Sequence, residues 1–179
     1  MTATTKRSPL GTLLRKHSAC DDAVKWAEPF ATLQEAWDVC PRADWMLWLL
    51  VQLHGYKGAV VHAAVDCAET ALPIFEERYP NDPRVRDCLA VTRRWADGKA
   101  TIDELRKART AAATGAVAYA AAAAAAADAA YAAYAADAAA AYAAAAAAAD
   151  ADAFGKARIA ALARMADLVR SRIPNPEVI

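Results

Sequence analysis

RADWMLWLLVQLH, residues Arg42–His54, is the most hydrophobic stretch of this chain that carries large side chains. Trp45 and Trp48 are three residues apart, so a helix would place both rings on one face. Gly55 follows directly, and glycine often ends a helix because it tolerates the left-handed backbone conformation found there. The sequence therefore predicts that Arg42–His54 is a helix at the centre of the core.

Three shorter helices are predicted before this stretch. They are expected at Pro9–Lys16, Ala19–Glu28 and Leu33–Val39. Thr32 and Glu35 have the spacing of a capping box, in which each side chain bonds the backbone N–H of the other residue. Ser18 is the predicted N-cap of the second helix, whose first turn carries acidic residues that favour a helix start.

Helix signals continue beyond Gly55. Ala59–Leu72 has apolar residues at helical spacing, and Pro73 then bends or restarts the chain. Asp82 can cap a further helix that has Pro83 at its first position, where the missing N–H of proline is not needed. Gly98 is expected to end that helix.

An alanine-rich tract occupies the C-terminal half of the chain. Thr101 and Glu104 repeat the capping-box spacing, so a helix is expected to start near Ile102 and to enter this tract. Between Ala111 and Ala153, 32 of 43 residues are alanine, the strongest helix former. The simplest interpretation places helix boundaries at Gly115 and Gly155.

The helix between those two glycines, Ala116–Phe154, would be about 57 Å long at 1.5 Å per residue. A helix of that length protrudes from a compact domain, so it either pairs with another copy or breaks near Asp128 or Asp137. Its tyrosines share one side of the helical wheel; they are Tyr119, Tyr131, Tyr134 and Tyr142.

Lys156–Ile173 is the predicted partner helix of the tract. Its apolar residues repeat in heptad fashion and are Ile159, Leu162, Ala166, Val169 and Ile173. Arginines surround this row, and they either balance the acidic tract or form a solvated basic face; they are Arg158, Arg164, Arg170 and Arg172.

No stretch alternates apolar and polar residues with β-branched enrichment, so we expect no sheet. The predicted fold is all-α, a bundle of about seven helices with a long alanine-rich helix in the C-terminal half. We expect one domain over residues 1–179. It divides into a Trp-rich half, an alanine-rich half and a tail, at 1–100, 101–173 and 174–179.

Composition excludes several classes of protein. The formal net charge is zero, so nothing draws the chain as a whole to nucleic acid or to an anionic membrane. Aspartates interrupt the alanine tract and disfavour a membrane span. No apolar run of signal-peptide length follows the N-terminus, and we expect a cytoplasmic protein. The four cysteines match no zinc or redox spacing and are expected to be buried thiols.

His62, Asp66 and Glu69 lie on one face of the predicted helix Ala59–Leu72. Such a group is either a hydrogen-bonded polar stripe or a set of metal ligands, and the absence of an HExxH motif favours the stripe. No cysteine or serine lies in a recognisable nucleophile motif, and no phosphate-cradling loop is present. We therefore predict no catalytic residue, no metal and no cofactor.

A ligand pocket is expected where polar side chains enter apolar helices. Asp44 is either a charge at a helix start or the buried partner of Arg93 or Arg94. Arginine beside tryptophan suits anionic or nucleotide-like ligands, although a solvated face is the alternative. The candidate binding residues are Asp44, Trp45, Trp48, His62, Asp66, Arg94 and Trp95.

Ala19–Leu50, ACDDAVKWAEPFATLQEAWDVCPRADWMLWLL, resembles a family of small bacterial and phage-encoded proteins, the Imm-5-like immunity proteins. VDCAETALP at Val65–Pro73 and RRWADGKATIDELRKA at Arg93–Ala108 continue the resemblance. It implies a helical protein that neutralises a toxin by binding it.

Three hypotheses about function follow. The first is a non-enzymatic binding protein, immunity-type or phage-encoded, that sequesters a protein partner such as a toxin or host factor. The second is a sponge for a nucleotide-like small molecule held in a pocket lined by tryptophan and arginine. The third is a self-assembling structural module, a homo-oligomer built on the alanine-rich helix.

Overall fold

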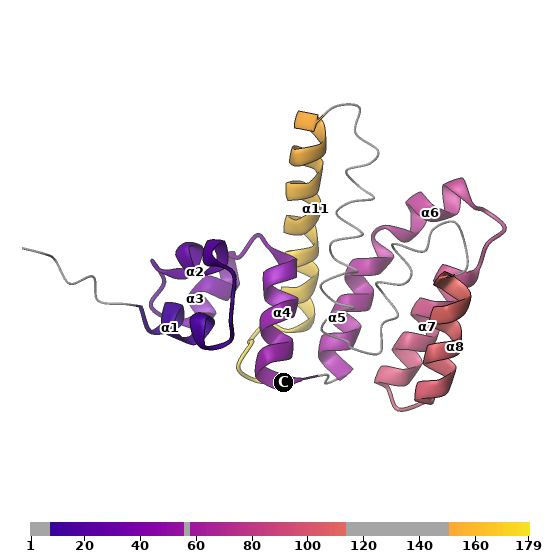
Figure 1. Cartoon of the computed structure of the whole chain (residues 1–179), viewed down its shortest axis with the longest axis horizontal. Coiled ribbons are helices and arrows are strands. Elements are labelled where there is room, and N and C mark those ends of the chain that lie inside the picture. Colours follow the sequence, from indigo (N-terminus) through magenta and orange to yellow (C-terminus); the bar gives the residue numbers. More distant parts are fainter. Residues whose placement is uncertain (1–7, 56–57, 114–150) are drawn as a thin grey trace, which may run out of the picture.

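The computed structural model describes residues 8–55, 58–113 and 151–179, and these ranges contain nine helices and no strand (Figure 1). The predicted all-α class is confirmed. The helices are α1 (Pro9–Lys16), α2 (Asp21–Ala27), α3 (Leu33–Val39), α4 (Ala43–His54), α5 (Gly58–Glu69), α6 (Leu72–Arg78), α7 (Arg84–Ala96), α8 (Ile102–Ala113) and α11 (Ala151–Arg172). They outnumber the roughly seven expected, in part because Pro73 starts the separate helix α6.

Capping boxes start α3 and α8, as the sequence predicts. The Thr32 hydroxyl accepts a hydrogen bond from the Glu35 N–H at 3.2 Å, and the Glu35 carboxylate accepts one from the Thr32 N–H at 3.3 Å. Thr101 and Glu104 exchange the same two bonds, at 3.2 and 2.7 Å. These bonds satisfy N–H groups that have no partner inside the helix.

Two other helix starts differ from expectation. Ser18 has a φ of 63° and ends α1, while Cys20 occupies the N-cap position of α2. The Ser18 N–H bonds a carbonyl of α1, which is the arrangement of a left-handed residue after a helix. α7 begins at Arg84 with Pro83 in the N-cap position, and the Asp82 carboxylate accepts the Arg84 N–H at 3.1 Å.

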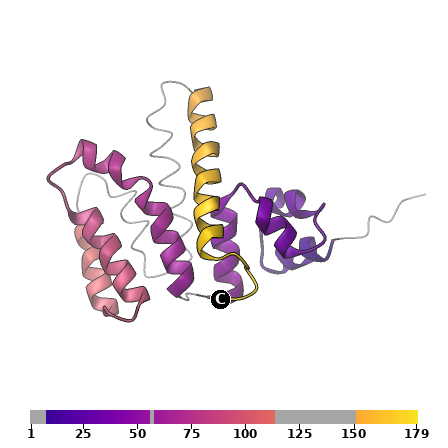
Figure 2. The same cartoon turned by 180° about the vertical axis from the view of Figure 1, so that it is seen from behind.

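α4, α5 and α11 pack against one another at the centre of the molecule, and both views show them side by side (Figures 1 and 2). Leu47 and Leu50 of α4 are fully buried there, which confirms its predicted central position. The other large buried side chains of this cluster include Trp37, Met46, Val60, Met165 and Val169. α11 thus brings the C-terminal part of the chain into the core of the N-terminal part.

The remaining helices flank this centre. α1, α2 and α3 lie beside α4 at one end of the molecule, where Leu10, Leu14, Val24 and Leu33 form a second buried cluster with Leu49 of α4. α7 packs on α5, and α8 packs on α7 at the opposite end (Figure 2).

Two predictions about α11 are wrong. The helix runs through Gly155, where a helix boundary was predicted. Ile159, expected in the buried row, is 65 % exposed, whereas Leu162, Ala166 and Val169 are buried. The reason is the rotation of α11: the core cluster contains Ala161 and Met165, so the buried face is turned away from Ile159.

The C-terminal tail is fastened to the N-terminal helices. The Trp37 indole N–H donates to the carbonyl oxygen of Ile173 at 3.0 Å. His54 Nε2 lies 2.5 Å from the carbonyl oxygen of Pro176. Arg170 donates to the carbonyl oxygens of Trp37 and Cys40 at 3.2 and 2.7 Å, so it does not belong to a solvated basic face.

The predictions for the tract between Ala113 and Ala151 lie outside the described residues, including its possible break near Asp128 or Asp137 and the common side of its tyrosines. In the ranges that the structure does describe, no helix combines the length and the hydrophobicity needed to cross a membrane.

Gly58 should be required by the packing of α5 on α7. A Cβ atom at this position would lie 2.9 Å from the backbone oxygen of Ala96, closer than such atoms approach. We expect Gly58→Ala to lower the free energy of unfolding by about 1–3 kcal/mol, because the two helices must move apart. Urea denaturation measures this.

Gly11→Ala is the matched control. A Cβ atom at Gly11 would meet the flexible end of the Arg15 side chain at 3.3 Å, and alanine is the better helix former. Stability of this variant should equal or exceed that of the wild type. A Gly58→Ala protein as stable as the wild type would contradict the proposed close packing.

Candidate binding surfaces

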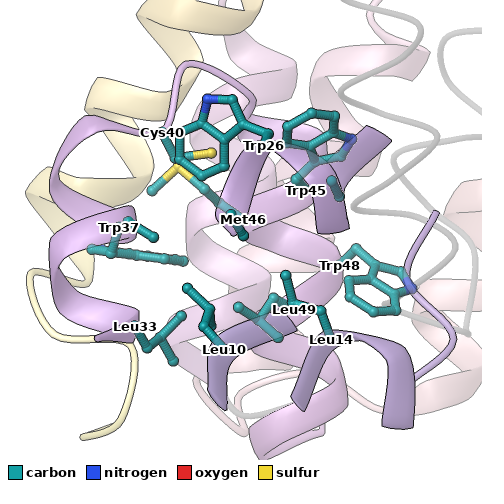
Figure 3. Close-up of a pocket in the computed structure, with 13 residues that line it drawn as sticks. Leu10, Leu14, Trp26, Leu33, Trp37, Cys40, Trp45, Met46, Trp48 and Leu49 are labelled. Carbon is teal, nitrogen blue, oxygen red and sulfur yellow. The ribbon is translucent and has the colours of Figure 1, made fainter. Parts of the chain in front are cut away.

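Four of the five tryptophans line one cavity between α1, α2, α3 and α4 (Figure 3). The cavity measures about 40 Å³, and every side chain that lines it is hydrophobic. The lining consists of Leu10, Leu14, Ala23, Trp26, Ala27, Leu33, Ala36, Trp37, Cys40, Trp45, Met46, Trp48 and Leu49. We call it the tryptophan cavity.

Trp26, Trp45 and Trp48 are half-buried, while the other lining residues are buried, and we call these three tryptophans the mouth of the tryptophan cavity. The rings of Trp26 and Trp45 contact each other, with centroids 5.9 Å apart. The Arg42 guanidinium lies 4.4 Å from the Trp45 ring centre and also bonds the buried Asp44 carboxylate, with an Nε–Oδ1 distance of 2.8 Å. A charge-balanced pair thus stands beside an apolar opening.

Asp66 joins three helices. Its carboxylate on α5 accepts hydrogen bonds from Arg93 of α7, at 2.6 Å, and from Arg172 of α11. Arg93 also bonds Glu69 at 2.7 Å. The Glu69 and Asp66 carboxylates hold the pKa of the Arg93 guanidinium above its usual range. This network, which we call the acid–arginine seam, connects α5, α7 and α11.

His62 extends the contact between α5 and α7. Its Nε2 atom lies 2.9 Å from a carboxylate oxygen of Asp97, just beyond the end of α7. Lys99 and then His62 lower the pKa of Asp97 by hydrogen bonding. All three residues of the predicted polar stripe are therefore hydrogen-bonded. Across the described ranges, no group of three or more His, Cys, Asp or Glu side chains is placed to hold a metal ion.

Each arginine of α7 is paired with a carboxylate. The pairs are Arg84 with Asp82, Arg86 with Glu76, Arg93 with Asp66 and Glu69, and Arg94 with Glu104. The pKa of Glu104 is lowered first by its bonds to Thr101 and then by Arg94. An anionic ligand at this surface would compete with these carboxylates.

The seven candidate binding residues lie in three places. Asp44, Trp45 and Trp48 are on α4, and the two tryptophans line the tryptophan cavity. His62 and Asp66 are on α5 in its contact with α7.

Arg94 and Trp95 are on α7, where Arg94 bonds Glu104 at the start of α8 and Trp95 is half-buried. Asp44 lies in the first turn of α4, which confirms the interpretation as a charge at a helix start; the alternative, a pairing with Arg93 or Arg94, is wrong. Asp44 pairs with Arg42 instead, because both residues lie at the start of α4.

Residues of these surfaces that were absent from the predicted set include Trp26, Trp37, Arg42, Arg93 and Arg172. The spacing of Arg42 and Trp45 would place the guanidinium over the ring on a helix, so that contact had a local signal. The contact of Arg172 with Asp66 had no local signal in the sequence, because 106 residues separate the two.

The buried cysteines are poor nucleophiles. Cys40, Cys67 and Cys88 are buried, whereas Cys20 is exposed, contrary to expectation. Burial raises the pKa of both Cys40 and Cys88 to about 11, so these thiols stay protonated at neutral pH.

Fold and surfaces together define an all-α protein whose polar side chains tie its helices together. Residues 56–168 match a family described as "Imm-5 like putative immunity protein". The match spans more than half of the chain, and the chain belongs to this family. No curated protein and no solved structure matches it. The matched range contains α5–α8 and most of α11, whereas the resemblance over Ala19–Leu50 falls outside it.

Loss of the Asp66 carboxylate should destabilise the protein. Asp66→Asn removes the charge that Arg93 and Arg172 share, and we expect the free energy of unfolding to fall by about 1–2 kcal/mol. Asp103→Asn is the control, since Asp103 is 85 % exposed in its pair with Arg106 and should contribute little. Equal stability of the two variants in urea would show that the acid–arginine seam contributes nothing.

The thiols should differ sharply in reactivity. At pH 8 we expect Ellman's reagent to modify Cys20 within seconds to minutes and the buried thiols only after denaturation, because burial restricts access and a raised pKa suppresses the thiolate. Cys20→Ser should remove the fast phase. Rapid reaction of a second thiol in the native protein would contradict the buried, protonated state of Cys40 and Cys88.

Proposed function

We propose that this chain is a non-enzymatic binding protein of the immunity type, which neutralises a toxin by sequestering it. The observation that carries this proposal is the match of residues 56–168 to the Imm-5 like family. An immunity protein acts by holding its partner, so it needs a rigid surface and no reactive group.

The chemistry of the described residues supports this proposal. Buried thiols with raised pKa values are poor nucleophiles, and the arginines of α7 are already paired with carboxylates. The nucleotide alternative has less support, because small-molecule pockets measure about 300–1,000 Å³. The tryptophan cavity, at about 40 Å³, is far smaller.

Products of the neighbouring genes are the partners to test. Each would be expressed in bacteria alone and together with this chain, and growth would be recorded. We expect one product to stop growth alone and to permit it when this chain is present. Size-exclusion chromatography should then recover both proteins in one complex.

Intact-mass spectrometry distinguishes sequestration from catalysis. Sequestration leaves both masses unchanged after mixing, whereas an enzyme that disarms the toxin covalently changes the mass of the toxin. A mass change, or protection without a complex, would contradict the proposed function.

A further inference from the structure

The tryptophan cavity has no part in the family assignment, because every residue that lines it precedes the matched range 56–168. It is nevertheless the place where most of the chain's tryptophans converge. An unfilled apolar cavity lacks packing partners on one side, so a group that filled it would gain those contacts.

Size and lining restrict the occupant. About 40 Å³ exceeds the roughly 10–15 Å³ that one water-sized group needs, and an apolar cavity that holds benzene measures about 150 Å³. The enclosed part therefore admits a methyl-sized group and excludes an aromatic ring. A polar group would lose its hydrogen bonds to water against these hydrophobic walls.

The mouth restricts the occupant further. Half-buried tryptophans and a stacked arginine are the residue types most often found at the centre of protein–protein interfaces. The charge of Arg42 is balanced by the buried Asp44, so this pair offers no net charge to an ionic group. These features suit an uncharged anchor residue on a polypeptide.

We propose that the tryptophan cavity receives one branched aliphatic side chain, leucine or valine, of the protein partner. A terminal methyl group fills the enclosed part, and Trp26, Trp45 and Trp48 pack around the rest of the side chain. This inference rests on the proposed function, since it names the group by which the partner is held.

The cavity is preorganised for this role. Trp37, which forms one wall, is held by its indole bond to the Ile173 carbonyl, and Arg170 bonds the carbonyl oxygens of Trp37 and Cys40. α3 is thereby fixed from outside the cavity. Little ordering of the walls then remains to oppose binding.

The NMR signals of the methionine methyl groups can show whether a small probe occupies the tryptophan cavity. Met46 lines the cavity, whereas Met165 is buried in the core cluster outside it. With ¹³C-methyl-methionine labelling, N-acetyl-leucinamide should shift the Met46 signal to saturation and leave the Met165 signal in place. N-acetyl-phenylalaninamide should not shift Met46 at the same concentrations.

Two variants test the site by size. Ala36→Val adds bulk to the cavity wall and should weaken binding of N-acetyl-leucinamide at least tenfold. Its unfolding midpoint should be at or above that of the control variant Ala90→Val, so that the loss of binding does not come from unfolding. Ala90 is exposed on α7, so Ala90→Val controls for valine in a helix and should bind like the wild type. Leu14→Ala enlarges the cavity and should gain binding of N-acetyl-phenylalaninamide, a gain that unfolding cannot produce.

Several results would overturn the inference. They are an unmoved Met46 signal, equal shifts at Met46 and Met165, and unchanged binding in Ala36→Val. A Met46 shift that follows protein concentration without any probe would assign the cavity to a second copy of the chain instead.

The growth assay separates this inference from the proposed function. If Ala36→Val protects cells as well as the wild type does, the immunity function stands and the cavity is not its anchor site. If no neighbouring product binds the wild type while N-acetyl-leucinamide still shifts Met46, the immunity function fails and the chemistry of the cavity stands.

Discussion

Burial of one face of α11 against α4 and α5 is the contact on which the arrangement of the other helices depends. Met165, Ala166 and Val169 on that face are buried, although they lie far along the chain from the helices they touch. Removal of this apolar surface from water stabilises the fold roughly in proportion to its area. Because α4 also carries α1–α3 and α5 also carries α7, the two flanks of the molecule are connected through this three-helix centre.

Apolar contact alone would let α11 rotate or slide, since the hydrophobic effect has no direction. Polar bonds remove that freedom. Arg172 binds the Asp66 carboxylate on α5, and Arg170 binds carbonyl oxygens at the end of α3. These groups are half-exposed, so their desolvation costs less than that of a fully buried ion pair. The polar stripe on α5 therefore connects α5 to its neighbouring helices.

Local signals predicted most helix boundaries, whereas contacts between distant segments could not be predicted. The capping box of α3 joins residues three positions apart, so its spacing is visible in the sequence. Ser18 was wrongly predicted to be the N-cap of α2, because the residue types that start helices also occur where helices end. Ile159 fits the heptad row, but the buried face of α11 is turned toward Ala161 and Met165, and a helical wheel does not show which face the neighbouring helices cover. The shared face of Trp45 and Trp48 was predictable from their spacing. The cavity beneath them was not, because it forms only where α1–α3 pack over α4.

The family match and the tryptophan cavity divide the molecule in an informative way. Residues 56–168 supply α5–α8 and most of α11, whereas the cavity is built by α1–α4. The helices that build the cavity are bonded to the tail that follows the matched range, through Trp37 to Ile173 and His54 to Pro176. The two unmatched segments thus stabilise each other across the central helices. Specificity needs contacts that differ between partners, and a surface that lies outside the matched range can vary while the three-helix centre is retained. For the proposed immunity function, this separation favours the tryptophan cavity over the acid–arginine seam as the surface that would select the partner.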